Sequence, residues 1–427
     1  MPVMPIQIPS NWLRGILSLV PLGAGVYALS QALKQRSTIR AESLDAVALR
    51  SRRVPDGRIA AAKDHRVEQT AWLRRKQNIA FLLGVMALLR WSLRSARAAQ
   101  GLLRGDPGSV AWSVHEVRRL RRPDGTELHI RCAGPPDGPS ILFVHGLGAD
   151  GNEWYPIRNQ LAGRFRVIDW DLPGLGKSTM PSNSDWSLER LARDLRAVLS
   201  VCEGRPAILV GHSLGGMILL TFCRLFPETL GRQVRGLVLA HATYTNPMKT
   251  TTWPRFYTAI QKPIIEPFCH LTIWLAPLLR PLCVLSYLNG LAHRFLQPRL
   301  FTGRESWEVL DFLARYYVWD RPDVVGRVTL AMFHYDETKT LEAIHIPTLV
   351  VSGDQDPCCT PACQAFMWER IPGAQLLTLS PAKHAGMLEY PRQFARALED
   401  FVSRCEQRSQ PVPVGSRRRR LPSLQAW

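Results

Sequence analysis

The chain has 427 residues, which is more than one typical domain needs, and it carries a net charge of +19. The charge lies at the ends: residues 1–112 carry +11 and 404–427 carry +5, whereas 113–403 carry only +3. A nucleic-acid enzyme usually has a basic body, so this distribution argues against a nucleic-acid partner. Basic ends beside apolar segments favour contact with an anionic membrane surface, the alternative for the C-terminus being a solvated basic tail.

The first 112 residues form a basic and apolar extension with one candidate membrane anchor. Residues 15–33 are free of charge and about long enough to span a bilayer as a helix. Residues 34–76 carry 12 Lys/Arg against 5 Asp/Glu, which predicts that they and the catalytic body lie on the cytoplasmic side. A shorter apolar run, 79–89, has basic residues on both flanks and is typical of a helix lying in the membrane interface.

Two alternatives remain open for this extension. Residues 15–33 are also compatible with a cleaved signal peptide, because small residues near Ala28 and Ser30 resemble a cleavage site. The two apolar runs are equally compatible with a helical hairpin that packs on the body of the protein. If 79–89 spans the membrane, the body is carried to the opposite face.

Nine cysteines are scattered without a repeated spacing. Cys358, Cys359 and Cys363 cluster, but their spacing is not one that zinc sites use. We therefore expect free thiols in a reducing compartment, with no metal and no cofactor.

From residue 113 onward, short apolar strands alternate with amphipathic helices. This alternation predicts an α/β fold with a mostly parallel sheet and helices on both faces, formed by 113–241 and 347–404. Between them, 242–346 are rich in Pro, Trp and Leu and are expected to form an inserted helical cap. Residues 405–427 are polar and basic and are expected to be disordered. The expected strands are 114–117, 128–131, 141–144, 165–169, one from Ile208, 234–240, 347–352 and 375–379.

The most informative stretch is Gly211-His-Ser-Leu-Gly215, which follows an apolar strand and precedes a helix expected to begin near Met217. G-x-S-x-G between a strand and a helix forms a sharp turn that holds a serine hydroxyl at the carboxyl end of a sheet. Gly211 and Gly215 are expected because a side chain at either position would collide with neighbouring backbone. The alternative is that this stretch is an ordinary strand–turn–helix without a catalytic serine.

The Gly211–Gly215 turn and the other motifs described in this paragraph together make residues from about 140 to 403, roughly 60% of the chain, resemble the α/β-hydrolase superfamily. His145-Gly146 is similar to the oxyanion loop of that family, and Asp171–Ser178 to its loop after the fourth strand. Gly353-x-x-Asp356 is similar to the loop that bears the catalytic acid. His384, followed by Glu389 and Pro391, is similar to the histidine loop.

The resemblance implies a role for each matching residue. Ser213 is the nucleophile, His384 its general base, and Asp356 the acid that orients His384. The backbone N–H groups of Leu147 and Leu214 form the oxyanion hole. Asp354 remains an alternative to Asp356 as the acid.

Four further polar residues near these motifs are interpreted as structural. We expect His212 to be packed away from the substrate, His145 to hold the oxyanion loop and Asp171 to stabilise its own loop. His241, at the end of a strand, is expected at the wall of the pocket. Asp171 stands where a phosphate-binding loop ending in Gly176-Lys177-Ser178 needs a glycine, which argues against nucleotide binding.

A serine nucleophile predicts an acyl-enzyme and hydrolysis of an ester, thioester or amide. The apolar cap favours a hydrophobic, lipid-like carboxylic ester, and hence an esterase or lipase. Two alternatives stay open: other chemistry on the same three residues, such as cofactor-free peroxidation, acyl transfer or C–C bond hydrolysis, and an inactive membrane-bound binding scaffold.

Overall fold

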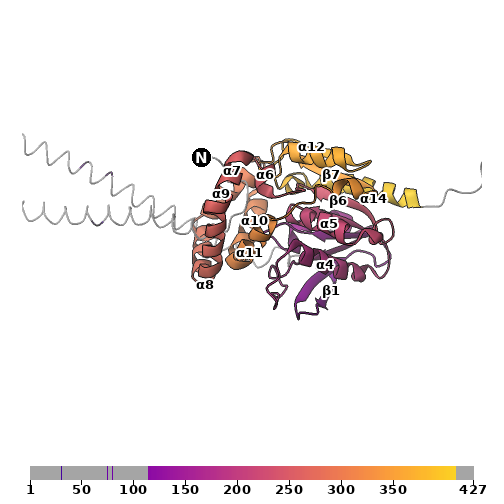
Figure 1. Ribbon diagram of the computed structural model, residues 1–427, viewed down its shortest axis with the longest axis horizontal. Coiled ribbons are helices and arrows are strands. Elements are labelled where there is room, and N and C mark those ends of the chain that lie inside the picture. Colours follow the sequence, from indigo (N-terminus) through magenta and orange to yellow (C-terminus); the bar gives the residue numbers. More distant parts are fainter. Residues whose placement is uncertain (1–29, 31–74, 76–78, 80–113, 410–427) are drawn as a thin grey trace, which may run out of the picture. The chain divides into compact units, whose positions relative to one another are not determined.

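The computed structural model describes residues 30, 75, 79 and 114–409. Within them, eight strands form one sheet in the order β1-β2-β4-β3-β5-β6-β7-β8. Strands β1, β6 and β7 are labelled in Figure 1. Strands β3 to β8 pair in parallel, while β1 and β2 are antiparallel at one edge. The predicted mostly parallel sheet is thereby confirmed. The strands are β1 Val114–Arg121, β2 Glu127–Ala133, β3 Ser140–Val144, β4 Arg166–Trp170, β5 Ala207–His212, β6 Val234–Ala240, β7 Thr348–Gly353 and β8 Gln375–Leu379.

Helices flank the sheet, as alternating strands and helices require. Helix α4 packs against α5, and α3 packs against α14. The apolar side of α4 is buried at Leu191, Leu195 and Val198, and the Ser187 side chain caps its first turn by accepting the Arg190 N–H. The helices of this unit are α3 Tyr155–Leu161, α4 Leu188–Val198, α5 Leu214–Leu225, α6 Pro247–Thr250, α7 Pro254–Ile260, α12 Pro361–Arg370, α13 Gly386–Glu389 and α14 Pro391–Ser409.

Two predicted helix boundaries are wrong, and the strand predicted at 114–117 continues to Arg121. Helix α5 begins at Leu214 and not near Met217, because the left-handed backbone of Ser213 turns the chain from strand to helix at one residue. Helix α14 continues to Ser409, so 405–409 belong to a helix and not to the expected disordered tail. Its buried side includes Phe394, Leu398 and Phe401, which explains why the helix is held in place.

The chain divides into two compact units. The first unit contains the sheet and its helices. The helical unit contains, among the described residues, 259–299 and 303–330, which lie within the predicted cap range of 242–346. Its main helices are α8 Glu266–Leu288, α9 Leu291–Leu300, α10 Trp307–Trp319 and α11 Pro322–Met332. The predicted anchor 15–33 and the apolar run 79–89 lie outside the described residues, apart from Ser30 and Ile79, as do 410–427.

Candidate active site

Ser213 lies at the turn between β5 and α5, at the carboxyl end of the sheet. Its φ of 52° and ψ of −113° are unusual for a residue with a side chain. The two glycines of the motif permit this turn. A Cβ at Gly211 would lie 2.5 Å from the carbonyl carbon of Gly215, and one at Gly215 would lie 2.2 Å from the Val144 oxygen. The predicted reason for both glycines is confirmed.

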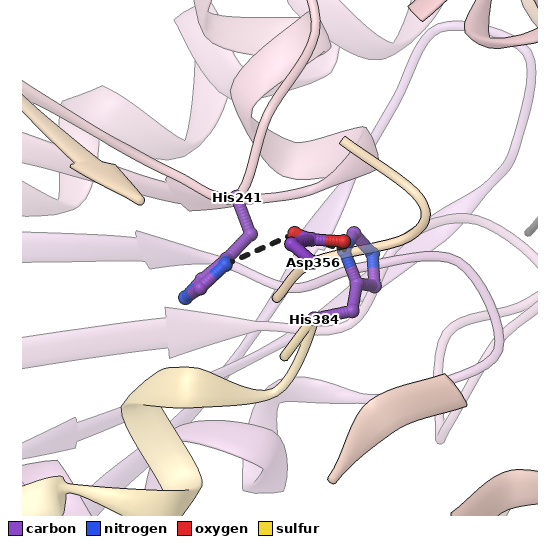
Figure 2. A group of neighbouring side chains, drawn as sticks. All are labelled: His241, Asp356 and His384. Carbon is purple, nitrogen blue, oxygen red and sulfur yellow. Dashed lines mark hydrogen bonds and ion pairs between the residues drawn. The ribbon is translucent and has the colours of Figure 1, made fainter. Parts of the chain in front are cut away.

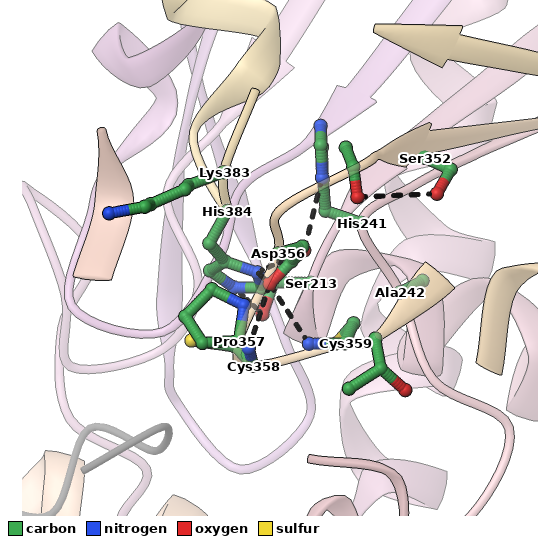
Figure 3. A network of polar contacts seen from close by, with 12 residues as sticks. Ser213, His241, Ala242, Ser352, Asp356, Pro357, Cys358, Cys359, Lys383 and His384 are labelled. Carbon is green, nitrogen blue, oxygen red and sulfur yellow. Dashed lines mark hydrogen bonds and ion pairs between the residues drawn. The ribbon is translucent and has the colours of Figure 1, made fainter. Parts of the chain in front are cut away.

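The structure brings Ser213, His384 and Asp356 together from three separate loops (Figure 3). His384 Nε2 lies 3.0 Å from Ser213 Oγ, and His384 Nδ1 lies 2.9 Å from Asp356 Oδ2. Because a carboxylate only accepts, Nδ1 carries the proton and Nε2 is free to accept from the serine hydroxyl. This tautomer is the one that general-base catalysis needs.

Asp356 is buried and accepts four hydrogen bonds (Figure 3). Its Oδ1 accepts the backbone N–H groups of Cys358 at 2.8 Å and Cys359 at 3.0 Å, while Oδ2 accepts from His384 and His241. Burial alone would raise the pKa of this carboxyl. The attraction of His384 and the bonds from both imidazoles outweigh burial and hold the pKa of Asp356 well below its ordinary value. Asp356 is therefore ionised at neutral pH.

The expectation that His241 lies at the pocket wall is wrong. Its side chain is fully buried, and Nδ1 lies 3.1 Å from Asp356 Oδ2 (Figure 2). Burial lowers the pKa of His241, so the ring is neutral and donates its Nδ1–H to the carboxylate. The acid thus lies between two imidazoles. The left-handed backbone of His241, with φ of 49°, follows directly after β6.

The alternative acid, Asp354, has a different place. Its side chain accepts the Ser380 hydroxyl at 2.7 Å and the Ala382 N–H at 2.8 Å. Asp354 therefore braces the loop that leads to His384, whereas Asp356 contacts the imidazole itself.

Beneath the serine, Glu153 and His212 form a buried ion pair. His212 Nδ1 lies 2.8 Å from Glu153 Oε1, and Nε2 lies 3.0 Å from the carbonyl oxygen of His384. Both partners are acceptors, so both ring nitrogens must donate, which only an imidazolium does. Burial lowers the pKa of His212, but the Glu153 charge outweighs burial and the net pKa is raised. His212 is packed, as expected, whereas Glu153 was not singled out from the sequence.

The same carboxylate also holds the oxyanion loop. Glu153 Oε2 accepts the Gly146 N–H at 3.0 Å. A Cβ at Gly146 would lie 2.9 Å from His212 Nδ1, which explains the glycine after His145. His145 Nε2 in turn accepts the Leu172 N–H at 2.9 Å, a structural role as expected.

The backbone N–H groups of Leu147 and Leu214 stay a prediction as the oxyanion donors. Leu214 is the first residue of α5, where backbone N–H groups have no partner within the helix. Leu147 follows Gly146 in the loop after β3. Asp171 holds the neighbouring loop by accepting the N–H groups of Gly151 and Lys177, each at 2.9 Å.

His241, Asp356 and His384 have donor atoms within 4.8 Å of one another, a grouping that could also hold a metal ion. Each imidazole Nδ1 is 2.9–3.1 Å from the carboxylate, at hydrogen-bond distance. A bound ion would need both of these nitrogens deprotonated and would therefore replace both hydrogen bonds. Nearby, burial raises the pKa of Cys363 to about 11, so its thiol is protonated and a poor ligand.

Residues 141–397, more than half of the chain, match the alpha/beta hydrolase family, and the chain belongs to that family. It is 27% identical over 269 residues to a pimeloyl-[acyl-carrier protein] methyl ester esterase of Aeromonas salmonicida, covering 62% of this chain and 96% of the esterase. An esterase from Exiguobacterium antarcticum has a similar fold, with a TM-score of 0.55, 22% identity and coverage of 67% and 100%.

A protein of unassigned function from Mycobacterium tuberculosis is 37% identical over 116 residues. The match covers 27% of this chain and 33% of that relative's length.

Proposed function

We propose that the protein is a serine hydrolase that cleaves a hydrophobic carboxylic ester. The observation that carries this proposal is the pair of contacts His384 Nε2 to Ser213 Oγ and His384 Nδ1 to Asp356. A free serine hydroxyl is a weak nucleophile, and an imidazole in this tautomer is the base that activates it.

The reaction runs through two acyl transfers. Ser213 Oγ attacks the ester carbonyl carbon while its proton passes to His384 Nε2. The resulting oxyanion accepts the N–H groups proposed for Leu147 and Leu214. As the tetrahedral intermediate collapses, the imidazolium protonates the leaving alcohol. Water, deprotonated by His384, then attacks the acyl-enzyme, and the carboxylic acid leaves as Ser213 regains its proton.

The hydrophobic substrate is proposed from the composition of the helical unit, which we propose acts as a cap. Along α8, most residues are apolar. Esterases among the relatives support ester chemistry, because the Aeromonas protein is named for its action on a methyl ester. Acyl transfer, cofactor-free peroxidation or C–C hydrolysis on the same residues is the second candidate, and an inactive scaffold the third.

Hydrolysis of acyl esters of increasing chain length tests this proposal. A hydrophobic pocket predicts that kcat/KM rises from acetyl to longer chains, by up to about fourfold per added CH₂ that is buried. The Ser213→Ala variant is the control for each substrate. A chain-length profile that falls steadily from acetyl would contradict a lipid-like substrate, and no hydrolysis of any ester would favour the second candidate.

We also propose that the protein is held at a membrane with its catalytic unit in the cytoplasm. The support is the charge-free run 15–33 followed by the basic residues 34–76. Protease treatment of sealed vesicles of known orientation tests the topology. Digestion of the catalytic unit only from the outer face would contradict it, and full recovery without salt or detergent in the soluble fraction would contradict the anchor.

A further inference from the structure

The long helix that begins with α7 and continues as α8 has an apolar side that faces outward. Residues Pro254–Leu288 form 35 residues of continuous helix, and the most apolar part has a mean hydropathy of 1.6. By length and composition this is the one described helical segment that could cross a membrane. Only 28% of that apolar part is buried. A core helix of such composition would be buried on nearly all sides, so this one is built for a different environment.

The exposed apolar residues form one stripe. Leu271, Trp274 and Leu278 are spaced by three and four residues, so they lie on the same side of α8, and they are 43%, 78% and 71% exposed. Ile264 precedes them at 58% exposure. We call Ile264, Leu271, Trp274 and Leu278 the apolar stripe. Exposed Trp and Leu in one continuous stripe mark an interaction surface.

The opposite side of α8 is packed within its own unit. Its buried residues include Thr272, Ala276 and Leu279. Tyr287 donates to Asp311 on α10 at 2.9 Å, and a Cβ at Gly326 on α11 would lie 2.8 Å from Ile273. A spanning helix would have to leave α10 and α11. The packing therefore favours a helix that lies flat against a surface rather than one that crosses it.

The charges of this helical segment indicate the kind of surface. Between Trp253 and Leu288 the single acid is Glu266, whose carboxylate accepts from Gln261, while Lys262 and Arg280 are exposed cations. At about 100° per residue, Arg280 lies on the other side of α8 from Leu271 and Leu278, so the apolar stripe itself carries no charge and any attraction to a surface comes from the neighbouring cations. An anionic bilayer complements them, and Trp is favoured at the level of the lipid headgroups.

We propose that the apolar stripe docks into the interfacial layer of a bilayer that contains anionic lipid, with α8 parallel to the membrane plane. This deepens the proposed function, since docking brings the enzyme to a surface where hydrophobic esters gather. The docking itself is argued from the exposure, packing and charges of α8 and does not depend on the proposed chemistry. It also differs from the anchor proposed for 15–33, because it places a surface of the folded protein in contact with lipid.

A spin label at the stripe tests the proposal in the full-length protein. All nine native cysteines are buried, so a Leu278→Cys variant offers a selectively reactive thiol. Val117→Cys on β1, where the native side chain is 55% exposed, is the matched control. With vesicles of phosphatidylcholine and phosphatidylglycerol, collisions of the label at 278 with a water-soluble nickel chelate should fall severalfold and collisions with oxygen should rise. The label at 117 should not change.

Adding Trp274→Glu to the Leu278→Cys variant should abolish this protection, and omitting phosphatidylglycerol should weaken it. Hydrolysis of a water-soluble short ester should persist in every variant. Absence of that activity from the wild type as well as the variants would count against the proposed function and not against docking. Equal chelate access at 278 with and without vesicles would overturn the proposal. Protection of the label at 278 from the chelate without vesicles would also overturn the proposal. Protection that depends on protein concentration would indicate a second copy as the occupant, and protection that does not would indicate a segment of the same chain.

Discussion

His212 and Glu153 form an ion pair that joins the two loops on which the proposed chemistry depends. Glu153 holds the Gly146 N–H of the oxyanion loop, and His212 donates to the carbonyl oxygen of His384 itself. The pair is buried, with 2.8 Å between His212 Nδ1 and Glu153 Oε1. The position of the base and the position of the oxyanion loop are therefore set by one side-chain pair.

Glu153→Gln should weaken the contacts that hold the oxyanion loop and the loop that carries His384. Removing one partner of a buried ion pair destabilises a protein by about 3 kcal/mol, and the oxyanion loop loses its charged acceptor. We expect a lower denaturation midpoint and a fall in kcat of about tenfold or more, with less effect on KM. In a cycle with His212→Asn, the two changes should couple by more than about 1 kcal/mol, whereas strictly additive effects would show that the pair does not act as a unit. Glu189→Gln, in an exposed pair with Arg224, is the matched control.

The stability contributed by this pair should depend on pH. The pKa of His212 is raised by folding, so its contribution is complete below the ordinary histidine value of about 6.5 and is lost as pH rises through the raised pKa. The pKa of Glu153 is lowered, so its contribution is complete above about 4.5 and is lost as pH falls. The difference in unfolding free energy between wild type and the double variant should be largest between about pH 4.5 and 6.5. A flat difference from pH 4 to 9 would show that His212 is not charged.

Asp356→Asn should reduce kcat far more than Asp354→Asn. The first change removes the acceptor that fixes the His384 tautomer, for which a loss of about 10⁴ is typical. The second alters only the brace to Ser380 and Ala382, on an exposed side chain. Steady-state rates on one soluble ester compare the two. If Asp354→Asn were the more damaging change, the acid would have been assigned to the wrong residue.

His241→Phe should lower kcat by about tenfold while KM changes little. The variant keeps a ring of similar shape but removes one of the four hydrogen bonds to Asp356, an interaction worth about 1 kcal/mol or more to a charged acceptor. The acid limb of the pH–rate profile should shift as well, since the carboxylate that stabilises the His384 imidazolium is less firmly held. His129→Phe replaces a buried histidine that makes no contact with Asp356, and it should leave kcat and the pH–rate profile unchanged. An unaltered pH–rate profile in His241→Phe would exclude this positioning role.

Local patterns in the sequence were sufficient to predict the sheet and the serine turn at its edge, whereas Asp356 and His384 were predicted from the resemblance of their loops to those of the α/β-hydrolase superfamily. The buried strands β3, β5 and β7 are continuous apolar runs, and Gly211 and Gly215 are needed at a turn that any strand–serine–helix junction must make. The start of α5 was misplaced because Gly215 and Gly216 are poor helix formers. Tertiary packing overrides that propensity, with Gly216 close to Ala242.

The second layer of the site could not be predicted in the same way. Glu153, His212 and His241 lie far apart in the chain, and their pairing depends on how β3, β5 and β6 align in the sheet. An acid immediately before the buried Trp154 was the one available signal for Glu153. For His241 the position at the end of β6 was correct, but its ring turns inward to Asp356, which no local pattern specifies.

Covalent labelling with a fluorophosphonate tests the central claim most directly, because the reagent reacts with an activated serine and not with an ordinary one. Intact mass analysis of the full-length protein should show one adduct, and peptide analysis should place it on Ser213. The Ser213→Ala variant should take up no label, keep its fold by circular dichroism, and lose ester turnover by about 10³-fold or more. An adduct on another residue, or turnover in Ser213→Ala above about a tenth of wild type, would contradict the assignment of Ser213 as nucleophile.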